Sequence, residues 1–256
     1  MLVLQPWTYD ALLVIGHAGA HRTSRGAATG ARIAIDAVVF DRDGVLTYFD
    51  LAGAARYLAP LVPLSVGAVV ARWQICQNAH AAPRSEDDER ALWELFWTGL
   101  ADELGLDADR RRRLLAFDYT RTVRAYPDAR PALLALRALG VRRAVFSNFS
   151  LPSIGASLAA CGLGDLVEAA WTGGVVGVRK PSRASYEFVL DALAVPPDRG
   201  LLLDDTPANV AGARALGMQA WLVDRSGRSA AADRSLRDLS TVAERVAGGM
   251  EPDVVG

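Results

Sequence analysis

From residue 36 onward, short apolar runs of the sequence alternate with stretches of helical periodicity, and this alternation restricts the possible folds most. The strand-like runs are residues 37–41, 143–148, 200–205 and 218–224, with a further short one inside the glycine-rich stretch 167–180. The helical stretches are residues 128–140, 150–164, 181–195 and 206–217. Short apolar runs are typical of strands buried on both faces, and strands separated by helices pair in parallel through right-handed crossovers. We therefore predict an α/β fold with a doubly wound, Rossmann-like parallel sheet at its core.

Residues 50–124 interrupt this alternation and predict an α-helical cap domain inserted after the first strand. Residues 85–105 have the pattern of an amphipathic helix, opened by an N-cap signal in which Ser85 precedes Asp88 by three positions. We expect the aromatic residues of this helix to lie in the core of the cap. A second helix is expected at 107–123, and the stretch before residue 81 is long enough for two more.

The chain therefore divides into four parts. They are an N-terminal extension (1–35) expected to be flexible, the Rossmann-like core (36–49 and 125–227), the helical cap (50–124) and a C-terminal tail (228–256) with one short helix. In the tail, Thr241 and Glu244 have the spacing of a capping box. No function is assigned to the extension, whose apolar segment lacks the basic residues that precede the apolar region of a signal peptide.

The overall charge and the cysteines narrow the class of protein. The net charge is −1 at pH 7, so nothing in the composition indicates a nucleic-acid or membrane partner. The two cysteines lie far apart and without metal-ligand spacing, so we expect no disulfide framework and a reducing, cytoplasmic location. The oligomeric state, monomer or homodimer, is left open.

Polar side chains follow the strand-like runs at the points where they end. The residues are Asp41 and Asp43, Ser147 and Asn148, Lys180, and Asp204 and Asp205. In doubly wound sheets, ligands bind at the carboxyl ends of the strands. These residues are therefore the candidate functional site.

Asp41 and Asp43 form a pair of carboxylates separated by one residue and followed by Gly44, which permits a turn. Left alone, the two carboxylates would raise each other's pKa. A divalent cation relieves this repulsion, and hard oxygen ligands of this kind suit Mg²⁺. One carboxylate is then available as a nucleophile and the other as a proton shuttle. A structural calcium loop is the alternative, but the sequence lacks the further acids that such a loop needs.

The other loops supply groups that complement these acids. Ser147 and Asn148 offer a hydroxyl, an amide and backbone N–H groups to an anion, and Lys180 is a cation next to Pro181. Of the adjacent acids Asp204 and Asp205, at least one is expected to face a metal.

Asn209 lies four residues beyond Asp205 and inside the next helix, where it is placed to orient a carboxylate or the water around a metal.

The order and spacing of these residues resemble the haloacid dehalogenase-like superfamily of hydrolases. The stretch DRDGVL (41–46) resembles the first motif of that family, and Ser147 in VFSN resembles the second. Lys180 in VRKPS resembles the third motif, and the run 201–218 resembles the fourth. The resemblance covers roughly residues 36–224, and the helical insertion falls where the family places an α-helical cap of the first class.

This resemblance implies roles for the matching residues. Asp41 would be the nucleophile that forms an aspartyl-phosphate. Asp43 would protonate the leaving group and then activate water, and its backbone carbonyl would bind Mg²⁺ together with Asp41 and Asp205. Ser147 and Lys180 would hold the phosphoryl oxygens.

Asn148 is a further candidate for phosphate binding. Asp204 and Asn209 would support the metal site without binding the ion directly.

The resemblance implies a Mg²⁺-dependent phosphatase acting on a small-molecule phosphate monoester. A phosphomutase that uses the same residues stays an alternative, as does a non-catalytic binding or regulatory protein that retains the fold. The dehalogenase branch is disfavoured, because Asp43 marks the branch that transfers phosphoryl groups. Arg42 departs from the family pattern, in which a hydrophobic residue is more common, and is expected to point away from the core.

Specificity is expected to come from the cap and from the segment that leads into it. Thr47, Tyr48 and Phe49 are candidates to face the leaving group, with hinge and packing roles equally open. The particular phosphate ester is not readable from the sequence.

Overall fold

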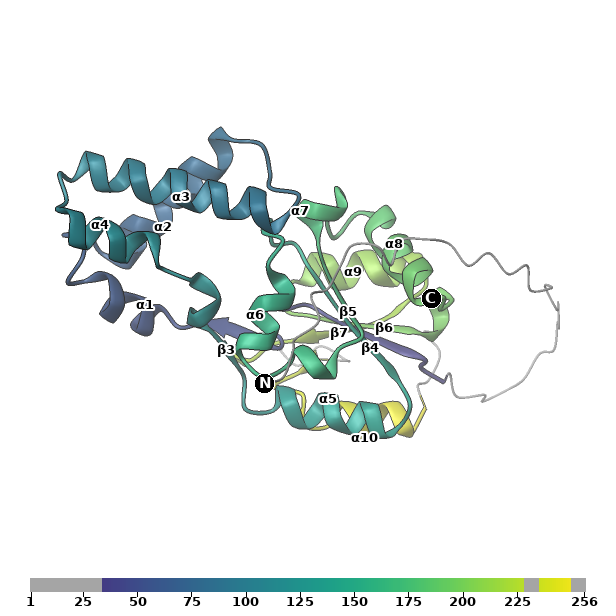
Figure 1. Cartoon of the computed structure of the whole chain (residues 1–256). Coiled ribbons are helices and arrows are strands. Elements are labelled where there is room, and N and C mark those ends of the chain that lie inside the picture. Colours follow the sequence, from purple (N-terminus) through teal and green to yellow (C-terminus); the bar gives the residue numbers. More distant parts are fainter. Residues whose placement is uncertain (1–33, 228–234, 250–256) are drawn as a thin grey trace, which may run out of the picture.

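The computed structural model describes residues 34–227 and 235–249. Within them a parallel sheet lies between helices, and a helical arm extends from one end of the sheet (Figure 1). The six strands have the order β5-β4-β1-β6-β7-β8, and all neighbours pair in parallel. Their bounds are β1 (Ala37–Phe40), β4 (Arg142–Ser147), β5 (Ala169–Thr172), β6 (Gly200–Asp204), β7 (Gln219–Val223) and β8 (Ser235–Leu236). This confirms the predicted fold class. Most of the predicted N-terminal extension, residues 1–33, lies outside the described residues.

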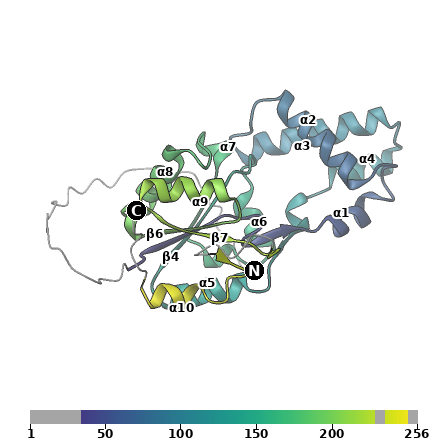
Figure 2. The same cartoon turned by 180° about the vertical axis from the view of Figure 1, so that it is seen from behind.

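Helices cover both faces of the sheet (Figure 2). One layer consists of α5 (Ala129–Ala138), α6 (Ile154–Ala160) and α10 (Val242–Ala247), and the other of α8 (Arg183–Leu193) and α9 (Pro207–Leu216). Successive side chains of β1 point to opposite faces. Val38 and Phe40 belong to the core under the first layer, and Ala37 and Val39 to the core under the second. The central strand is therefore buried on both faces, as its continuous apolar sequence predicts.

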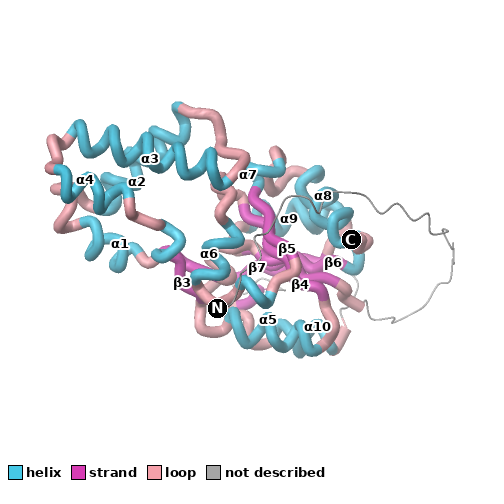
Figure 3. Tube along the Cα trace, viewed as in Figure 1, coloured by secondary structure: helices cyan, strands magenta, loops and turns pink. Residues whose placement is uncertain are grey.

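The helical arm, called here the helical insert (residues 50–122), is joined to the core by two short strands. These strands, β2 (Thr47–Phe49) and β3 (Val123–Ala125), pair in antiparallel fashion. The insert contains α1 (Leu51–Leu58), α2 (Val66–Ala79), α3 (Glu86–Glu103), α4 (Ala108–Leu115) and a 3₁₀ helix (Tyr119–Thr122), drawn in Figure 3. The sequence did not predict the two-stranded connection.

The insert has an apolar core of its own. Phe96, Trp97 and Leu100 of α3 are buried in it, and Trp73 of α2 stacks on Trp93 with ring centroids 3.5 Å apart. The expectation that the aromatic residues of α3 lie in this core is confirmed. The predicted capping box is also present, since Ser85 and Asp88 each accept a hydrogen bond from the other's backbone N–H.

One predicted helix boundary and one predicted capping box are wrong. The helix expected at 107–123 ends at Leu115, because the buried side chains of Leu114 and Tyr119 both reach the core of the insert and the chain turns between them. In the tail, Thr241 makes no capping hydrogen bond. Its backbone, at φ −98° and ψ −1°, lacks the extended conformation that a capping side chain needs.

No helix in the described part of the chain is both long enough and apolar enough to cross a membrane.

Candidate active site

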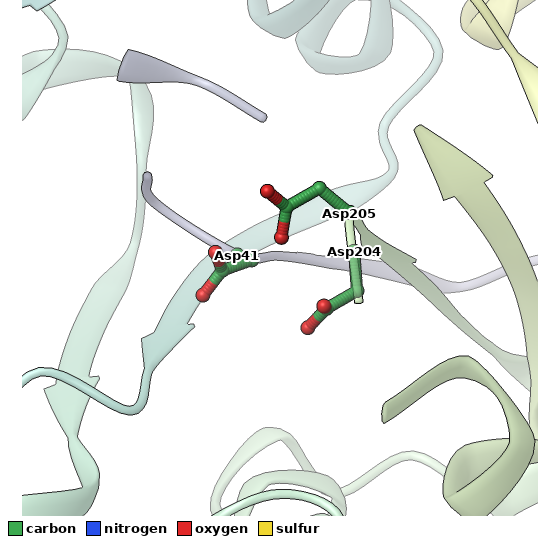
Figure 4. A group of neighbouring side chains, drawn as sticks. All are labelled: Asp41, Asp204 and Asp205. Atoms are coloured by element: carbon green, nitrogen blue, oxygen red, sulfur yellow. The ribbon is translucent and has the colours of Figure 1, made fainter. Parts of the chain in front are cut away.

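The pairing of β1 with β6 brings acidic residues together at the carboxyl edge of the sheet. Phe40 is in register with Leu203, so the residues that follow them, Asp41 and Asp204, are neighbours. The backbone N–H of Asp41 donates to the carbonyl of Leu203 at 2.8 Å. Figure 4 shows the side chains of Asp41, Asp204 and Asp205 close together at the ends of these two strands. One carboxylate oxygen from each lies within 4.8 Å of the others.

Lys180 bridges two of these carboxylates. Its Nζ lies 2.8 Å from Oδ1 of Asp41 and 2.6 Å from Oδ2 of Asp204. Burial lowers the pKa of Lys180, but Asp41 and Asp204 raise it by more, so the ammonium group stays charged. An ammonium group has three donors. Two are used here, which leaves one for a ligand.

Asp204 is held by donors of the protein on both of its oxygens. Its Oδ1 accepts from the backbone N–H of Thr206 at 2.9 Å and from Nδ2 of Asn209 at 3.0 Å. Asn209 is in turn anchored by Tyr186, whose hydroxyl donates to its carbonyl at 2.7 Å. Asp204 is completely buried, and its role in the geometry is to hold Lys180.

Asp205 lies against Gly44. Gly44 has φ +81°, in the region that favours glycine, and a Cβ atom there would overlap the carboxylate of Asp205. Glycine is therefore required at position 44 for two reasons. It permits the turn after Asp43, and it leaves room for the carboxylate of Asp205 beside the backbone. Burial raises the pKa of Asp205, and the charge of Asp204 adds to the rise.

The donor set at this edge fits a magnesium ion. Burial raises the pKa of Asp41 to about 7; Lys180 acts in the opposite direction, and the charge of Asp204 adds to the rise. The negative charge of the neighbouring carboxylates favours a bound cation, and carboxylate oxygens are ligands that Mg²⁺ takes. Because Asp204 is occupied by Lys180 and Asn209, Asp41 and Asp205 are the carboxylates left to bind it.

The sequence suggested that Arg42 points away from the core, and this expectation is wrong. Its side chain is buried, Nη1 donates to Oγ of Ser157 at 3.1 Å, and its guanidinium lies over the ring of Phe149, 4.2 Å from the centroid. Nη2 donates to Oδ2 of Asp43 at 2.7 Å. The expectation is wrong because Asp43 neutralises the charge of the guanidinium and Ser157 satisfies a further donor.

Asp43 lies outside the group of three carboxylates. Besides Arg42, it is bonded to Thr47, whose Oγ1 donates to Oδ1 of Asp43 at 3.3 Å. The side chain of Asp43 is 46% exposed. It is therefore fixed in place and still open to a substrate.

Ser147 is the last residue of β4, and Asn148 follows it at the same edge of the sheet. Ser147 is buried, and its Oγ accepts from the backbone N–H of Phe149 at 3.2 Å. Asn148 holds the backbone of Lys180, since its Nδ2 donates to the Lys180 carbonyl and its Oδ1 accepts from the Lys180 N–H, both at 2.8 Å. The amide of Asn148 thus positions Lys180, and phosphate binding by Asn148 stays a prediction.

The three residues proposed to face the leaving group have different positions. Thr47 is buried against Asp43, whereas Tyr48 is exposed and packs on Tyr126 with centroids 5.0 Å apart. Phe49 lines a cavity of about 320 Å³ between the helical insert and the core. Of the three, Phe49 is the one that borders this space.

The sequence holds one further signal for the site, and it conceals one buried acid that lies outside the site. Lys180 is the one lysine in a sequence that otherwise uses 27 arginines, and that bias singles it out independently of any motif. Glu89 of α3 is buried and accepts from the backbone N–H and the hydroxyl of Ser153, at 2.9 and 2.7 Å. It lies in an acidic stretch of exposed residues, so no signal in the sequence distinguishes it.

The fold is a doubly wound α/β fold with three carboxylates and a buried lysine at the carboxyl edge of its parallel sheet. Residues 35–217 match the haloacid dehalogenase-like hydrolase family. The chain belongs to this family, as its motifs suggested.

Curated relatives include phosphatases. The chain is 37% identical over 211 residues to phosphatase MT3486 of Mycobacterium tuberculosis, covering 82% of this chain and 96% of that protein. It is 31% identical over 196 residues to a phosphoglycolate phosphatase of Rhodospirillum rubrum, covering 71% and 76%.

Solved structures share the fold. A 2-haloacid dehalogenase from Pseudomonas syringae superposes with a TM-score of 0.59 at 24% identity, over 84% of this chain and 98% of that one. A haloacid dehalogenase-like phosphatase from Thermococcus onnurineus superposes with a TM-score of 0.55 at 23% identity, over 84% and 99%. At these identities the likeness concerns the fold alone.

Proposed function

We propose that the protein is a Mg²⁺-dependent phosphatase that hydrolyses a small-molecule phosphate monoester through an aspartyl-phosphate on Asp41. The observation that carries the proposal is the contact of Asp41 with Lys180, with Asp43 two residues further on and Asp205 beside them. In this proposal Asp41 is the nucleophile, Lys180 is the cation that binds the phosphoryl group, and Asp43 is the proton donor, all at one edge of the sheet. The names of the phosphatase relatives support the same reading.

In the first step, a carboxylate oxygen of Asp41 attacks phosphorus, and the bond from phosphorus to the ester oxygen breaks. Asp43 gives its proton to the departing alcohol oxygen. In the second step, Asp43 takes a proton from water, the water oxygen attacks phosphorus, and the bond to Asp41 breaks. Inorganic phosphate and the alcohol are released, and Asp43 is again protonated.

The remaining residues bind and position. Lys180 directs its third N–H, and Ser147 its hydroxyl, to the phosphoryl oxygens. Asp41, Asp205 and the backbone carbonyl of Asp43 would hold the metal ion. Mg²⁺, when bound, supplies positive charge that stabilises the transferring phosphoryl group.

Asp43 favours this function over dehalogenation, since a halide ion needs no proton to leave whereas an alkoxide does. A phosphomutase uses the same groups and differs in transferring the phosphoryl group to a second hydroxyl. A non-catalytic protein would bind phosphate esters without turning them over.

The test is release of inorganic phosphate from a panel of phosphate monoesters with millimolar Mg²⁺. Asp41→Asn should abolish release, whereas Asp191→Asn, an exposed aspartate of α8, should leave it unchanged. Asp205→Asn should raise the Mg²⁺ concentration for half-maximal activity and reduce the stabilisation against heat that Mg²⁺ gives the wild type.

Other outcomes identify the alternatives. Transfer to a second hydroxyl without free phosphate would indicate the mutase, and halide release from 2-haloacids the dehalogenase. Binding of esters without turnover, in wild type and Asp41→Asn alike, would indicate a non-catalytic protein.

A further inference from the structure

The cavity of about 320 Å³ between the helical insert and the core meets the proposed active site at Asp43. Asp43 is one of its lining residues and lies two positions beyond Asp41. In the proposed reaction Asp43 protonates the oxygen of the leaving alcohol, so the rest of that alcohol lies on the side of Asp43 that faces away from the phosphoryl group. Asp43 lines the cavity, whereas Asp41 and Lys180 are not among its described lining residues, so the cavity is the space available to the alcohol.

The lining of the cavity is aromatic and aliphatic. Trp73 and Trp93 stack at 3.5 Å between centroids, and Phe96 meets the ring of Trp73 edge-on at 5.2 Å. Val69 and Val70 of α2 add aliphatic surface. Stacked rings form a wall that is held in place, and such a wall binds hydrocarbon by removing it from water.

Two polar groups of the lining are engaged by the protein itself, whereas Nε1 of Trp97 has no hydrogen-bond partner within the described part of the chain. Nε2 of Gln77 donates to Oγ of Ser150 at 3.0 Å, and the hydroxyl of Tyr119 shares a 2.6 Å hydrogen bond with Oγ of Ser153. A sugar that entered the cavity would give up its hydrogen bonds to water and find few replacements. Leaving hydroxyl groups unpaired in a buried space is unfavourable, which disfavours polyhydroxylated leaving groups.

The charge of the lining disfavours anionic leaving groups as well. Among the described residues that line the cavity, Arg42 and Asp43 carry the charges. They are bonded to each other, and Arg42 is also bonded to Ser157. A carboxylate or a second phosphate on the leaving group would therefore meet no free cation there.

We propose, on the basis of the phosphatase function above, that the substrate is a phosphate monoester of a predominantly apolar alcohol whose hydrocarbon part occupies this cavity. One molecule of liquid water takes about 30 Å³, so the space holds on the order of ten non-hydrogen atoms. This size corresponds to a short alkyl chain or to one aromatic ring with its linker.

The test compares esters of primary alcohols, which have similar acidity, so that binding of the hydrocarbon decides the rates. The series is ethyl, butyl, hexyl and 2-phenylethyl phosphate, with glycerol 1-phosphate, glucose 6-phosphate and phosphoglycolate as polar or anionic comparisons. We expect kcat/KM to rise about threefold per added methylene, and butyl phosphate to exceed glycerol 1-phosphate by about tenfold or more.

A matched pair of variants tests whether the preference for longer hydrocarbon chains depends on the cavity. Val70 lines the cavity from α2, and Ala71 follows it on the exposed side of the same helix. Val70→Trp should fill the cavity and lower the ratio of kcat/KM for hexyl over ethyl phosphate at least tenfold. Ala71→Trp should leave that ratio unchanged. Thermal unfolding of both variants shows whether each is folded.

The outcomes separate this inference from the proposed function. If glycerol 1-phosphate, glucose 6-phosphate or phosphoglycolate is hydrolysed as well as hexyl phosphate or better, the inference is wrong and the phosphatase function stands. If no ester is hydrolysed, the phosphatase function fails, and quenching of tryptophan fluorescence on titration with hexyl and glycerol phosphates decides the inference. Tighter binding of hexyl phosphate would support it, and equal or weaker binding would overturn it.

Discussion

The buried guanidinium of Arg42 donates to Oδ2 of Asp43 at 2.7 Å, so the proposed proton donor of the site is held by its own neighbour in the chain. Arg42 is fixed in turn by Ser157 and Phe149, which follow β4 more than 100 positions later in the sequence. Because the guanidinium of Arg42 is bonded to Asp43 and Ser157, its proposed role is to position Asp43.

Arg42→Leu should therefore lower kcat by roughly tenfold and leave KM nearly unchanged, because general acid catalysis contributes about 10²–10⁴-fold and depends on geometry. The loss should be large with 2-phenylethyl phosphate, whose alkoxide needs a proton. It should be small with p-nitrophenyl phosphate, whose phenolate leaves without one. Arg90→Leu, at an exposed ion pair on α3, is the control. Equal losses with both esters would show that Arg42 has a merely structural role.

The second prediction concerns the type of cation at position 180. Lys180 is a compact charge that bonds to Asp41 and Asp204 at once, in a space with no exposure to solvent. The planar guanidinium of arginine is larger and has a fixed geometry. Lys180→Arg should therefore lower kcat/KM about 100-fold or more, although the charge is kept and the rest of the chain uses arginine throughout.

Phosphate release assays measure this loss, and circular dichroism checks the fold. The control is the reverse exchange, Arg183→Lys, at an exposed position of α8 outside the proposed site. It should have no effect. Activity of Lys180→Arg within about threefold of the wild type would show that any cation suffices there.

The third prediction separates the two demands on Gly44. Alanine at φ +81° costs about 1 kcal/mol of backbone strain, and its Cβ also displaces the carboxylate of Asp205. Gly140 has φ +73°, and no atom lies within 4 Å of the place that a Cβ would take, so Gly140→Ala carries the strain alone. Gly44→Ala should lose at least as much thermal stability as Gly140→Ala, and Gly44→Ala alone should need at least tenfold more Mg²⁺ for half-maximal activity. If the Mg²⁺ concentration for half-maximal activity rose equally in both variants, the proposed role of Gly44 in placing Asp205 would be contradicted.

Much of the fold and part of the site follow from the sequence for a physical reason. A strand buried on both faces has to be apolar along its whole length, so the acids that follow Phe40 and Leu203 mark both the end of the strand and the edge of the sheet. Lys180 and Ser147 are recognisable in the same way, because their loops lead from strands of that sheet.

What the sequence does not predict depends on contacts between distant segments. The burial of Arg42 requires Ser157 and Phe149 to close over it. The cavity arises from the packing of α2 and α3 against each other and the core, and helical periodicity marks an apolar face without showing that a space remains beside it. The aromatic residues of α3 were therefore rightly predicted as core, but their lining of the cavity was not.

The last prediction concerns one of the contacts that join the helical insert to the core. The carboxylate of Glu89 on α3 accepts from the backbone N–H and the hydroxyl of Ser153, and from Nε1 of Trp93 at 3.3 Å. Glutamine can accept with one oxygen only, so Glu89→Gln would turn an N–H₂ group toward one of these donors. At pH 7 the free energy of unfolding should fall by about 1–3 kcal/mol, whereas Glu94→Gln, at an exposed position of the same helix, should change it by less than about 0.5 kcal/mol.

The pH dependence of this difference has a definite sign. Burial raises the pKa of Glu89 above its ordinary value of 4.5, and the hydrogen bonds from Ser153 reduce the rise. Between that value and the raised pKa, the unfolded chain has lost the proton that the folded chain still binds, so this group's contribution to stability falls as the pH rises. The advantage of the wild type over Glu89→Gln in urea denaturation should therefore be larger at pH 4.5 than at pH 7. An advantage that grows toward pH 7 would mean that the ionised carboxylate is the form preferred in the fold.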